Sequence, residues 1–253
     1  MLELDFKDKQ IVQDGINFIS SDALSNEEYH KLYALSASGI KMAHKDPKLL
    51  AKKDLLMRLP SPALDMGTAV HEALLEPDKF DINKYSLTPA NVTKLKVMIN
   101  NGKVMFDYIL KSTKNEVSLI IEDEGFTRKV RVDAYDEARG IVYDVKTTRY
   151  NSKSKFIRDA YDLDYHLQSA FYLDTLRLAG YKADYFAFLV IPSENPCEPF
   201  ALQVSDRFVE DGRGIYSEIV ENILSYDKTK EEVFFDVIDL PIWRLKQLGE
   251  DYE

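Results

Sequence analysis

The sequence has almost no cysteine and no phosphate-binding glycine motif. Its 253 residues include one cysteine, Cys197, and the pattern G-x-x-x-x-G-K-[ST] does not occur. A single thiol excludes an intrachain disulfide, a cysteine-rich zinc site and a cysteine-ligated iron–sulfur cluster. The missing glycine pattern argues against an ATP motor in this chain.

Long apolar runs are also missing. No stretch of about 18 apolar residues occurs, so no membrane helix is expected. The first residues, MLELDFKDKQ, are charged and lack the apolar segment of a secretory signal. We therefore expect a protein that resides in the cytoplasm.

Basic residues are fewer than acidic residues. The chain has 33 Lys and Arg against 43 Asp and Glu, and the net charge of −10, taken alone, disfavours a nucleic-acid partner. Binding depends on local fields, however, and residues 146–158 hold five bases and no acid: Lys146, Arg149, Lys153, Lys155 and Arg158. By itself such a cluster indicates a solvated loop, but it lies directly after two acidic residues of interest.

Hydrophobic patterning predicts helices, then a strand meander, then further helices and strands. The predicted helices cover about 36–46, 63–76, 92–112, 164–180 and 206–225, the third being one or two helices broken near Asn100–Gly102. Ser36 or Ser38 is the expected N-cap of the first, and Gly180 lies just past the end of the fourth. The predicted strands cover about 116–123, 127–136, 140–148, 184–192 and 198–206.

This order of elements defines the fold class. It is α/β (α+β), with a mixed central sheet flanked by helices. We expect one domain over residues 1–253, with a helical part at about 29–112, a sheet core at about 115–205 and a C-terminal helix and tail at 206–253.

The segment RVDAYDEARGIVYDVKTT, residues 131–148, carries a chemical signal. Asp144 and Lys146 are two apart on a predicted strand and share one face, while Asp133 lies on the adjacent strand. If these strands pair, two carboxylates and an ammonium converge. Clustered carboxylates repel unless a cation joins them, and oxygen ligands suit Mg²⁺ or Mn²⁺, which can activate water for phosphodiester cleavage. The alternative is a surface hairpin with an ordinary ion pair.

Two helical motifs accompany the carboxylates. In GTAVHEAL, residues 67–74, His71 follows Gly67 by four residues, and its imidazole would add to the carboxylate site. In QSAFY, residues 168–172, Gln168 and Tyr172 share one helix face. The alternatives are a half-buried helix histidine, and a tyrosine that packs on the sheet beside an exposed glutamine.

Taken in order, these motifs resemble a known family. G-x-x-x-H on a helix, an aspartate, D-x-K on strands and Q-x-x-x-Y on a helix are similar to the RecB-type branch of the PD-(D/E)xK nucleases, and more closely to the RecE-type exonucleases of phages and prophages. The resemblance spans about Tyr29 to Pro192 and rests on five stretches: LSASGIK, MGTAVHEALLEPDKF, RKVRVDAYD, VYDVKTT and YHLQSAFYLD. The chain lacks the cysteine cluster of the iron–sulfur members, and Glu116 is an extra acid without an assigned role.

The resemblance implies a fold and a set of site residues. The fold is a mixed sheet with helices on both sides, and two Mg²⁺ ions occupy the site, with Mn²⁺ as a possible substitute. By position, the metal ligands would be His71, Asp133, Asp144 and the carbonyl of Val145. Lys146 would position the attacking water, and Gln168 and Tyr172 would line the site and touch the DNA backbone.

Related exonucleases also hold a 5′-terminal phosphate in a small polar pocket, for which this chain has similar groups. Ser38 lies near a predicted helix start, where backbone N–H groups favour an anion, and Arg131 lies on the same strand face as Asp133. Lys31, Arg149 and Gln168 are further candidates for contacts with DNA. The alternatives are that Ser38 is only an N-cap and that Arg131 only balances the carboxylates.

The resemblance therefore implies a metal-dependent exonuclease that acts on linear double-stranded DNA. It would degrade one strand from the 5′ end and leave 3′ single-stranded tails for annealing recombination. Family members form rings of three or four subunits and work with a single-strand annealing protein. Two alternatives stay open: a single-strand exonuclease or endonuclease of the same superfamily, and a non-catalytic module that binds DNA ends.

Overall fold

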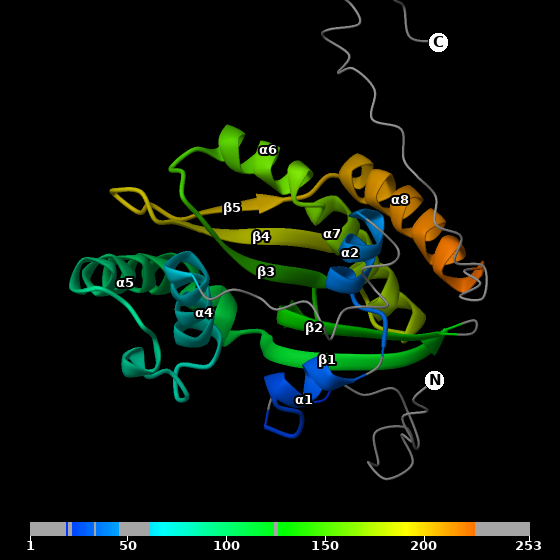
Figure 1. Cartoon of the computed structure of the whole chain (residues 1–253), viewed down its shortest axis with the longest axis horizontal. Coiled ribbons are helices and arrows are strands. Elements are labelled where there is room, and N and C mark those ends of the chain that lie inside the picture. Colours follow the sequence, from blue (N-terminus) through cyan, green and yellow to red (C-terminus); the bar gives the residue numbers. More distant parts are fainter. Residues whose placement is uncertain (1–18, 20–21, 33, 46–60, 124–125, 226–253) are drawn as a thin grey trace, which may run out of the picture. The chain divides into compact units, whose positions relative to one another are not determined.

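The structure is a computed structural model that describes residues 19, 22–32, 34–45, 61–123 and 126–225 (Figure 1). The chain divides into two compact units, Met1–Ile223 and Leu224–Glu253, and all five strands belong to the first. The expected tail beyond residue 225 lies outside the described residues, and the single domain over 1–253 stays a prediction.

A mixed sheet forms the centre of the first unit. Its strands lie side by side in chain order: β1 (Lys114–Asp123), β2 (Phe126–Asp136), β3 (Ile141–Thr148), β4 (Tyr185–Pro192) and β5 (Phe200–Gln203). The first three form an antiparallel meander, β4 is parallel to β3, and β5 is antiparallel to β4. The predicted fold class and all five predicted strands are confirmed.

Helices cover both faces of this sheet (Figure 1). One face packs against α2 (Ala37–Lys45), α6 (Lys153–Asp162), α7 (Tyr165–Leu178) and α8 (Asp206–Ser225). The other face packs against α4 (Pro62–Leu75) and α5 (Pro89–Lys111). The short helix α1 (Asn26–Lys31) and the 3₁₀ turn η3 (Ile82–Lys84) are the remaining helical segments in the described ranges.

Strand β4 shows why the sheet is buried on both sides. Phe186, Phe188 and Val190 belong to the core beneath α7, whereas Leu189 and Ile191 belong to the core beneath α4 and α5. Successive side chains of a strand point to opposite faces, so an unbroken apolar run suits a central strand covered by helices. The parallel step from β3 to β4 is made by α6 and α7, as a crossover requires.

Helix α5 is continuous, so the break that we considered near Asn100–Gly102 does not occur. The Asn101 side-chain amide donates to the carbonyls of Pro196 and Cys197, 3.2 and 3.0 Å away. A Cβ at Gly102 would lie 3.2 Å from Leu74 of α4. These polar and small residues therefore serve contacts between elements rather than a helix break.

Helix α6 shows that residues 146–158 are not the solvated loop that their charges alone indicate. Ser152 caps it, because its Oγ accepts from the Lys155 N–H, and Phe156 and Ala160 are buried. Apolar residues four apart give this polar segment one packed face. The basic residues of the segment lie on β3, in the turn and on α6 instead of along one loop.

The ends of two helices follow the expected chemistry. Ser36 rather than Ser38 is the N-cap of α2, since its Oγ accepts from the Gly39 N–H at 3.3 Å. Gly180, with φ of 81°, follows the end of α7, and its N–H donates to the Arg177 carbonyl at 2.9 Å. In the ranges that the structure describes, every helix is too short or too polar to cross a membrane.

Candidate active site

The pairing of β2 with β3 brings the predicted carboxylates together. Ala134 lies opposite Tyr143, and the ladder ends there, beside Asp133 and Asp144. Beyond the last backbone pair, the Asp133 side chain joins the two strands, because its Oδ2 accepts a hydrogen bond from the Val145 N–H at 2.7 Å. On β3, Lys146 Nζ forms an ion pair with Asp144 Oδ2.

Helix α4 adds His71 to this site. Its Nδ1 lies 3.6 Å from Asp133 Oδ2, and its Nε2 donates to the Val145 carbonyl at 2.5 Å. A Cβ at Gly67, one turn earlier, would lie only 3.3 Å from Thr147 Oγ1 on β3. The glycine of G-x-x-x-H therefore lets α4 approach the strand that carries the catalytic candidates.

Glu116 of β1 completes a cluster that the sequence did not assign. The register places it opposite Asp133, at a position that the β1–β2 ladder skips, and its φ is 47°. A non-glycine residue in the left-handed region is strained, and such strain concentrates at functional sites. Ligand atoms of His71, Glu116 and Asp133 all lie within 4.8 Å of one another.

The electrostatics of this cluster favour an added cation. Burial, and next the Asp133 carboxylate, raise the pKa of Glu116 to about 8. Burial likewise raises the pKa of Asp133 to about 6, although His71 opposes the change. Two oxygen donors and an imidazole within one small space fit a divalent ion, which would relieve this repulsion. Asp144 is not one of the three clustered donors, so its predicted role as a metal ligand stays a prediction.

Helices α7 and α2 hold the other side of the site. Gln168 is buried, and its Nε2 donates to Asp144 Oδ1 at 2.6 Å. Its Oε1 accepts from Lys41 Nζ of α2 at 3.2 Å. Both Lys41 and Lys146 lie over the Tyr165 ring, 4.6 and 4.9 Å from its centroid.

Tyr172 lies one turn after Gln168 on α7 and faces the same region. Its ring packs edge-on against Phe186, with centroids 6.2 Å apart. Burial and then nearby charged groups, including Asp144, Asp133 and Glu116, raise its pKa well above the usual value. Gln168 and Tyr172 thus share one helix face toward the carboxylates, and the alternative of an exposed glutamine is wrong.

Arg131 is buried, and its charge opposes the rise in the pKa of Glu116, but its hydrogen bonds go to other groups. Its Nε donates to Ser118 Oγ at 2.8 Å and its Nη2 to the Leu24 carbonyl at 2.5 Å. Its guanidinium also lies 4.7 Å from the centroid of the Tyr29 ring. The guanidinium thus fastens the chain before α1 to the sheet, and its role toward a phosphate stays a prediction.

The other candidates for DNA contacts are nearer to solvent. Ser38 is exposed, and its Oγ lies 3.0 Å from Ser36 Oγ. Lys31 is exposed and pairs with Glu27 at 2.5 Å. Arg149 follows the end of β3 and stacks on Tyr150, 4.6 Å from the ring centroid. No hydrogen bond or ion pair links Ser38 to Arg131 among the described residues.

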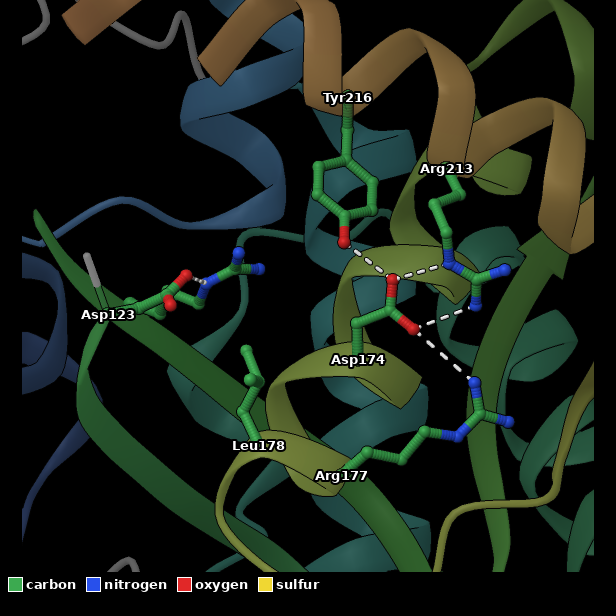
Figure 2. Close-up of a pocket in the computed structure, with 7 residues that line it drawn as sticks. Asp123, Asp174, Arg177, Leu178, Arg213 and Tyr216 are labelled. Atoms are coloured by element: carbon green, nitrogen blue, oxygen red, sulfur yellow. Dashed lines mark hydrogen bonds and ion pairs between the residues drawn. The ribbon is translucent and has the colours of Figure 1, made fainter. Parts of the chain in front are cut away.

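A second charged cluster lines a surface pocket between β1, β2, α7 and α8 (Figure 2). Asp174 lies at its centre and accepts from Arg213 at 2.7 and 2.8 Å, from Tyr216 at 2.5 Å and from Arg177 at 3.3 Å. Burial alone would raise the pKa of Asp174, but the bonds from Arg213 and Tyr216 prevail and lower it. The positive charges that balance Asp174 are therefore supplied by Arg213 and Arg177 of the same chain.

Sequence reasoning missed two residues of the site. The sequence marks Glu116 only as an extra acid and assigns no role to Lys41, although Lys41 ends the LSASGIK stretch. An acid that opens a strand opposite a candidate ligand was a usable signal for Glu116. No local signal marks Lys41, because its contact with Gln168 joins residues 127 positions apart.

Comparison with known proteins agrees with this architecture. A family profile described as a PDDEXK-like domain of unknown function matches residues 36–233. The chain therefore belongs to this PDDEXK-like family, and the resemblance to the PD-(D/E)xK class is confirmed. No match was found among curated proteins.

Two of the solved structures that match this chain are described as exonucleases. A candidate exonuclease from Eubacterium rectale is 19% identical, with a TM-score of 0.64 over 92% of this chain and 98% of the other. A phage-related exonuclease from Haemophilus somnus 129PT is 12% identical, with a TM-score of 0.37 over 75% of this chain and 93% of the other. The first likeness establishes a shared fold.

Proposed function

We propose that this protein is a metal-dependent nuclease that cleaves DNA. One observation carries the proposal: His71, Glu116 and Asp133 form a three-donor cluster beside the Asp144–Lys146 ion pair. Membership of the PDDEXK-like family supports the same class of reaction.

The proposed metal site is built from this chain's own donors. His71, Glu116 and Asp133 would hold a divalent ion, with Asp144 and the Val145 carbonyl as further ligands. Mg²⁺, or Mn²⁺ in its place, would supply Lewis-acid stabilisation of the charge that develops during phosphodiester hydrolysis. The resemblance implies two such ions per site.

The remaining residues would orient the reactants. Lys146, held beside Asp144, would position the attacking water and counter negative charge on the phosphate. Gln168 would fix the Asp144 carboxylate through its 2.6 Å hydrogen bond. Tyr172 would line the site next to the carboxylates and contact the DNA backbone.

We further propose that the enzyme is an exonuclease that degrades linear duplex DNA from 5′ to 3′. The similarly folded protein from Eubacterium rectale is described as a candidate exonuclease, and the sequence motifs resemble RecE-type enzymes. Ser38, exposed at the start of α2, would contact the 5′ phosphate. Arg149 would contact the backbone. A ring of three or four subunits and a single-strand annealing partner complete the proposal.

The test is digestion of duplex DNA in Mg²⁺ by the wild type and by Lys146→Ala. The substrates are linear duplexes with and without 5′ phosphates and a closed circle. The proposal expects loss of nucleotides from phosphorylated 5′ ends by the wild type only, with intact circles. A variant that cleaves as fast as the wild type would contradict the role of Lys146.

Other outcomes separate the alternatives. Nicking of closed circles would indicate an endonuclease on the same fold. Digestion of single strands alone would indicate a single-strand exonuclease. Binding to duplex ends without cleavage in Mg²⁺ or Mn²⁺ would favour a DNA-end-binding module. Gel filtration with and without DNA would test the ring, and co-purification with an annealing protein would test the partner.

A further inference from the structure

We propose that Lys41 is a positioning residue of the active site, which orients the Gln168 amide and, through it, the Asp144 carboxylate. This inference rests on the proposed function for its catalytic consequence. The orientation of the Gln168 amide itself depends only on contacts within the chain.

A continuous relay leads from Lys41 to the carboxylate. Lys41 Nζ donates to Gln168 Oε1 at 3.2 Å, and Gln168 Nε2 donates to Asp144 Oδ1 at 2.6 Å. Asp144 also forms the ion pair with Lys146. The relay therefore joins helix α2, helix α7 and strand β3 at the catalytic candidate.

The two ends of the relay determine the orientation of the amide. An ammonium only donates hydrogen bonds, and an ionised carboxylate only accepts them. While Lys41 is protonated, the Gln168 carbonyl must therefore face Lys41, and its NH₂ group must face Asp144. Burial, and next the Lys146 ammonium, lower the pKa of Lys41 to about 7, so this constraint is strongest below that pH. The reversed amide would place NH₂ against the ammonium and the carbonyl against the carboxylate. Both contacts would then be repulsive.

The surroundings hold Lys41 in this place. Its ammonium lies over the Tyr165 ring at 4.6 Å, the same ring that Lys146 approaches at 4.9 Å. On the next turn of α2, His44 Nδ1 lies 3.3 Å from Asp164 Oδ1, at the start of α7. Helix α2 is therefore fixed against the helix that carries Gln168.

This arrangement explains why a second lysine lies near the site. Without Lys41, one of the two interactions that select the amide orientation is lost. The NH₂ group would then spend less time on Asp144, and the carboxylate would be less well oriented. Partners behind a ligand typically change activity or metal affinity by about 10- to 100-fold.

The first test uses the metal-free protein and needs no activity. In ¹H–¹⁵N spectra, the Gln168 side-chain NH₂ signals are assigned by their loss in Gln168→Leu. The proposal expects these signals to shift in Lys41→Met and to exchange faster with solvent, while Lys41→Arg restores them. Lys45→Met is the matched control, because Lys45 is an exposed cation on the same helix.

The second test measures cleavage of linear duplex DNA in Mg²⁺. We expect Lys41→Met to lower kcat about 10-fold with KM for DNA nearly unchanged, and Lys41→Arg to retain most of it. Lys41→Met/Gln168→Leu should be no slower than Gln168→Leu alone, because the lysine acts through the glutamine.

The outcomes separate this inference from the proposed function. Unchanged Gln168 signals in Lys41→Met would overturn the inference whatever the activity. Additive losses in the double variant would also overturn it, since they would indicate direct contact with substrate. If the wild type cleaves no DNA, the proposed function fails, and the spectra still decide whether Lys41 orients Gln168.

Discussion

Helix α7 contributes to two acidic clusters with opposite balances of charge. At Asp174, guanidinium groups of Arg213 and Arg177 and the Tyr216 hydroxyl meet a single carboxylate (Figure 2). At the other cluster, Glu116 and Asp133 face one imidazole, while the Lys146 ammonium pairs with Asp144.

The pKa values follow this balance. The pKa of Asp174 lies below its usual value, whereas those of Glu116 and Asp133 are raised to about 8 and about 6. At Asp174, the arginines of the chain neutralise the carboxylate, and Arg213 holds α7 to α8. The cluster of His71, Glu116 and Asp133 has more carboxyl groups than nearby positive charges can neutralise, as expected where a divalent cation binds.

The largest expected effect is on catalysis. We expect Asp133→Asn to lower the cleavage rate by about 1,000-fold or more, because it removes a charged donor from the metal cluster. Asp174→Asn should stay within about 3-fold of the wild type, since that cluster lies outside the site. Initial rates on linear duplex DNA measure both, and an equal loss in the two variants would erase the distinction between the clusters.

The next effect is on stability. Asp174→Asn should lower the free energy of unfolding by about 2–4 kcal/mol at pH 7, because two arginines lose their carboxylate. The lowered pKa means that this stabilisation is complete above the ordinary pKa of 3.8 and disappears as pH falls through the folded value. Urea unfolding at pH 7 and at pH 3 measures the difference.

Asp184→Asn is the control for that measurement. Asp184 pairs with Lys182 at 3.6 Å, and both side chains are about half exposed. Its replacement should change stability by less than about 0.5 kcal/mol. If the exposed pair mattered as much as Asp174, burial and bonding would not explain the second cluster.

A smaller effect of opposite sign is expected at Glu116. The folded protein keeps its proton up to about pH 8, while an unfolded glutamate ionises near 4.5, so stability falls as pH rises between these values. Glu116→Gln removes that loss and should stabilise the metal-free protein by about 1–2 kcal/mol at pH 8, and by less at pH 5. Added Mg²⁺ should stabilise the wild type more than the variant. Thermal unfolding with EDTA or Mg²⁺ measures this, and a destabilised metal-free variant would show that the Glu116 carboxyl does not destabilise the metal-free protein at high pH.

The smallest effect concerns cations outside both clusters. Arg149 stacks on Tyr150 and has no carboxylate partner among the described residues, whereas Lys31 is paired with Glu27. Arg149→Ala should weaken DNA binding by about 2- to 5-fold and reduce the salt slope by about one. Lys31→Ala should leave both unchanged. Fluorescence anisotropy at several salt concentrations compares the two variants. Equal effects would show that an ion pair with a carboxylate does not determine which basic residues contact DNA.

Much of the fold was predictable because it is encoded locally. The apolar run of β4 and the glycine after α7 indicated their structures directly. The prediction failed at α6, where a polar segment becomes helical through Phe156 and Ala160. The sequence also suggested a break in α5 near Asn100–Gly102. There, Asn101 bonds to the Cys197 carbonyl and Gly102 lies close to Leu74, and both contacts join residues far apart in the sequence.

The candidate site was predictable in part. Asp144 and Lys146 lie two apart on one strand, and the β2–β3 turn brings Asp133 near them. Glu116 requires the β1–β2 register, and Lys41 requires the contact of α2 with α7. Arg131 has bonds that its place near Asp133 in the sequence does not indicate, because they reach Ser118 and Leu24, and its predicted contact with a phosphate stays a prediction.

Anomalous diffraction from crystals of the wild type soaked in Mn²⁺ would locate the catalytic cation directly. We expect a manganese peak bonded to an Asp133 oxygen and to His71 or Glu116, and no peak at Asp174. A peak at Asp174, or none at Asp133 in crystals whose protein cleaves DNA with Mn²⁺, would contradict the claim that the acid-rich cluster holds the catalytic cation.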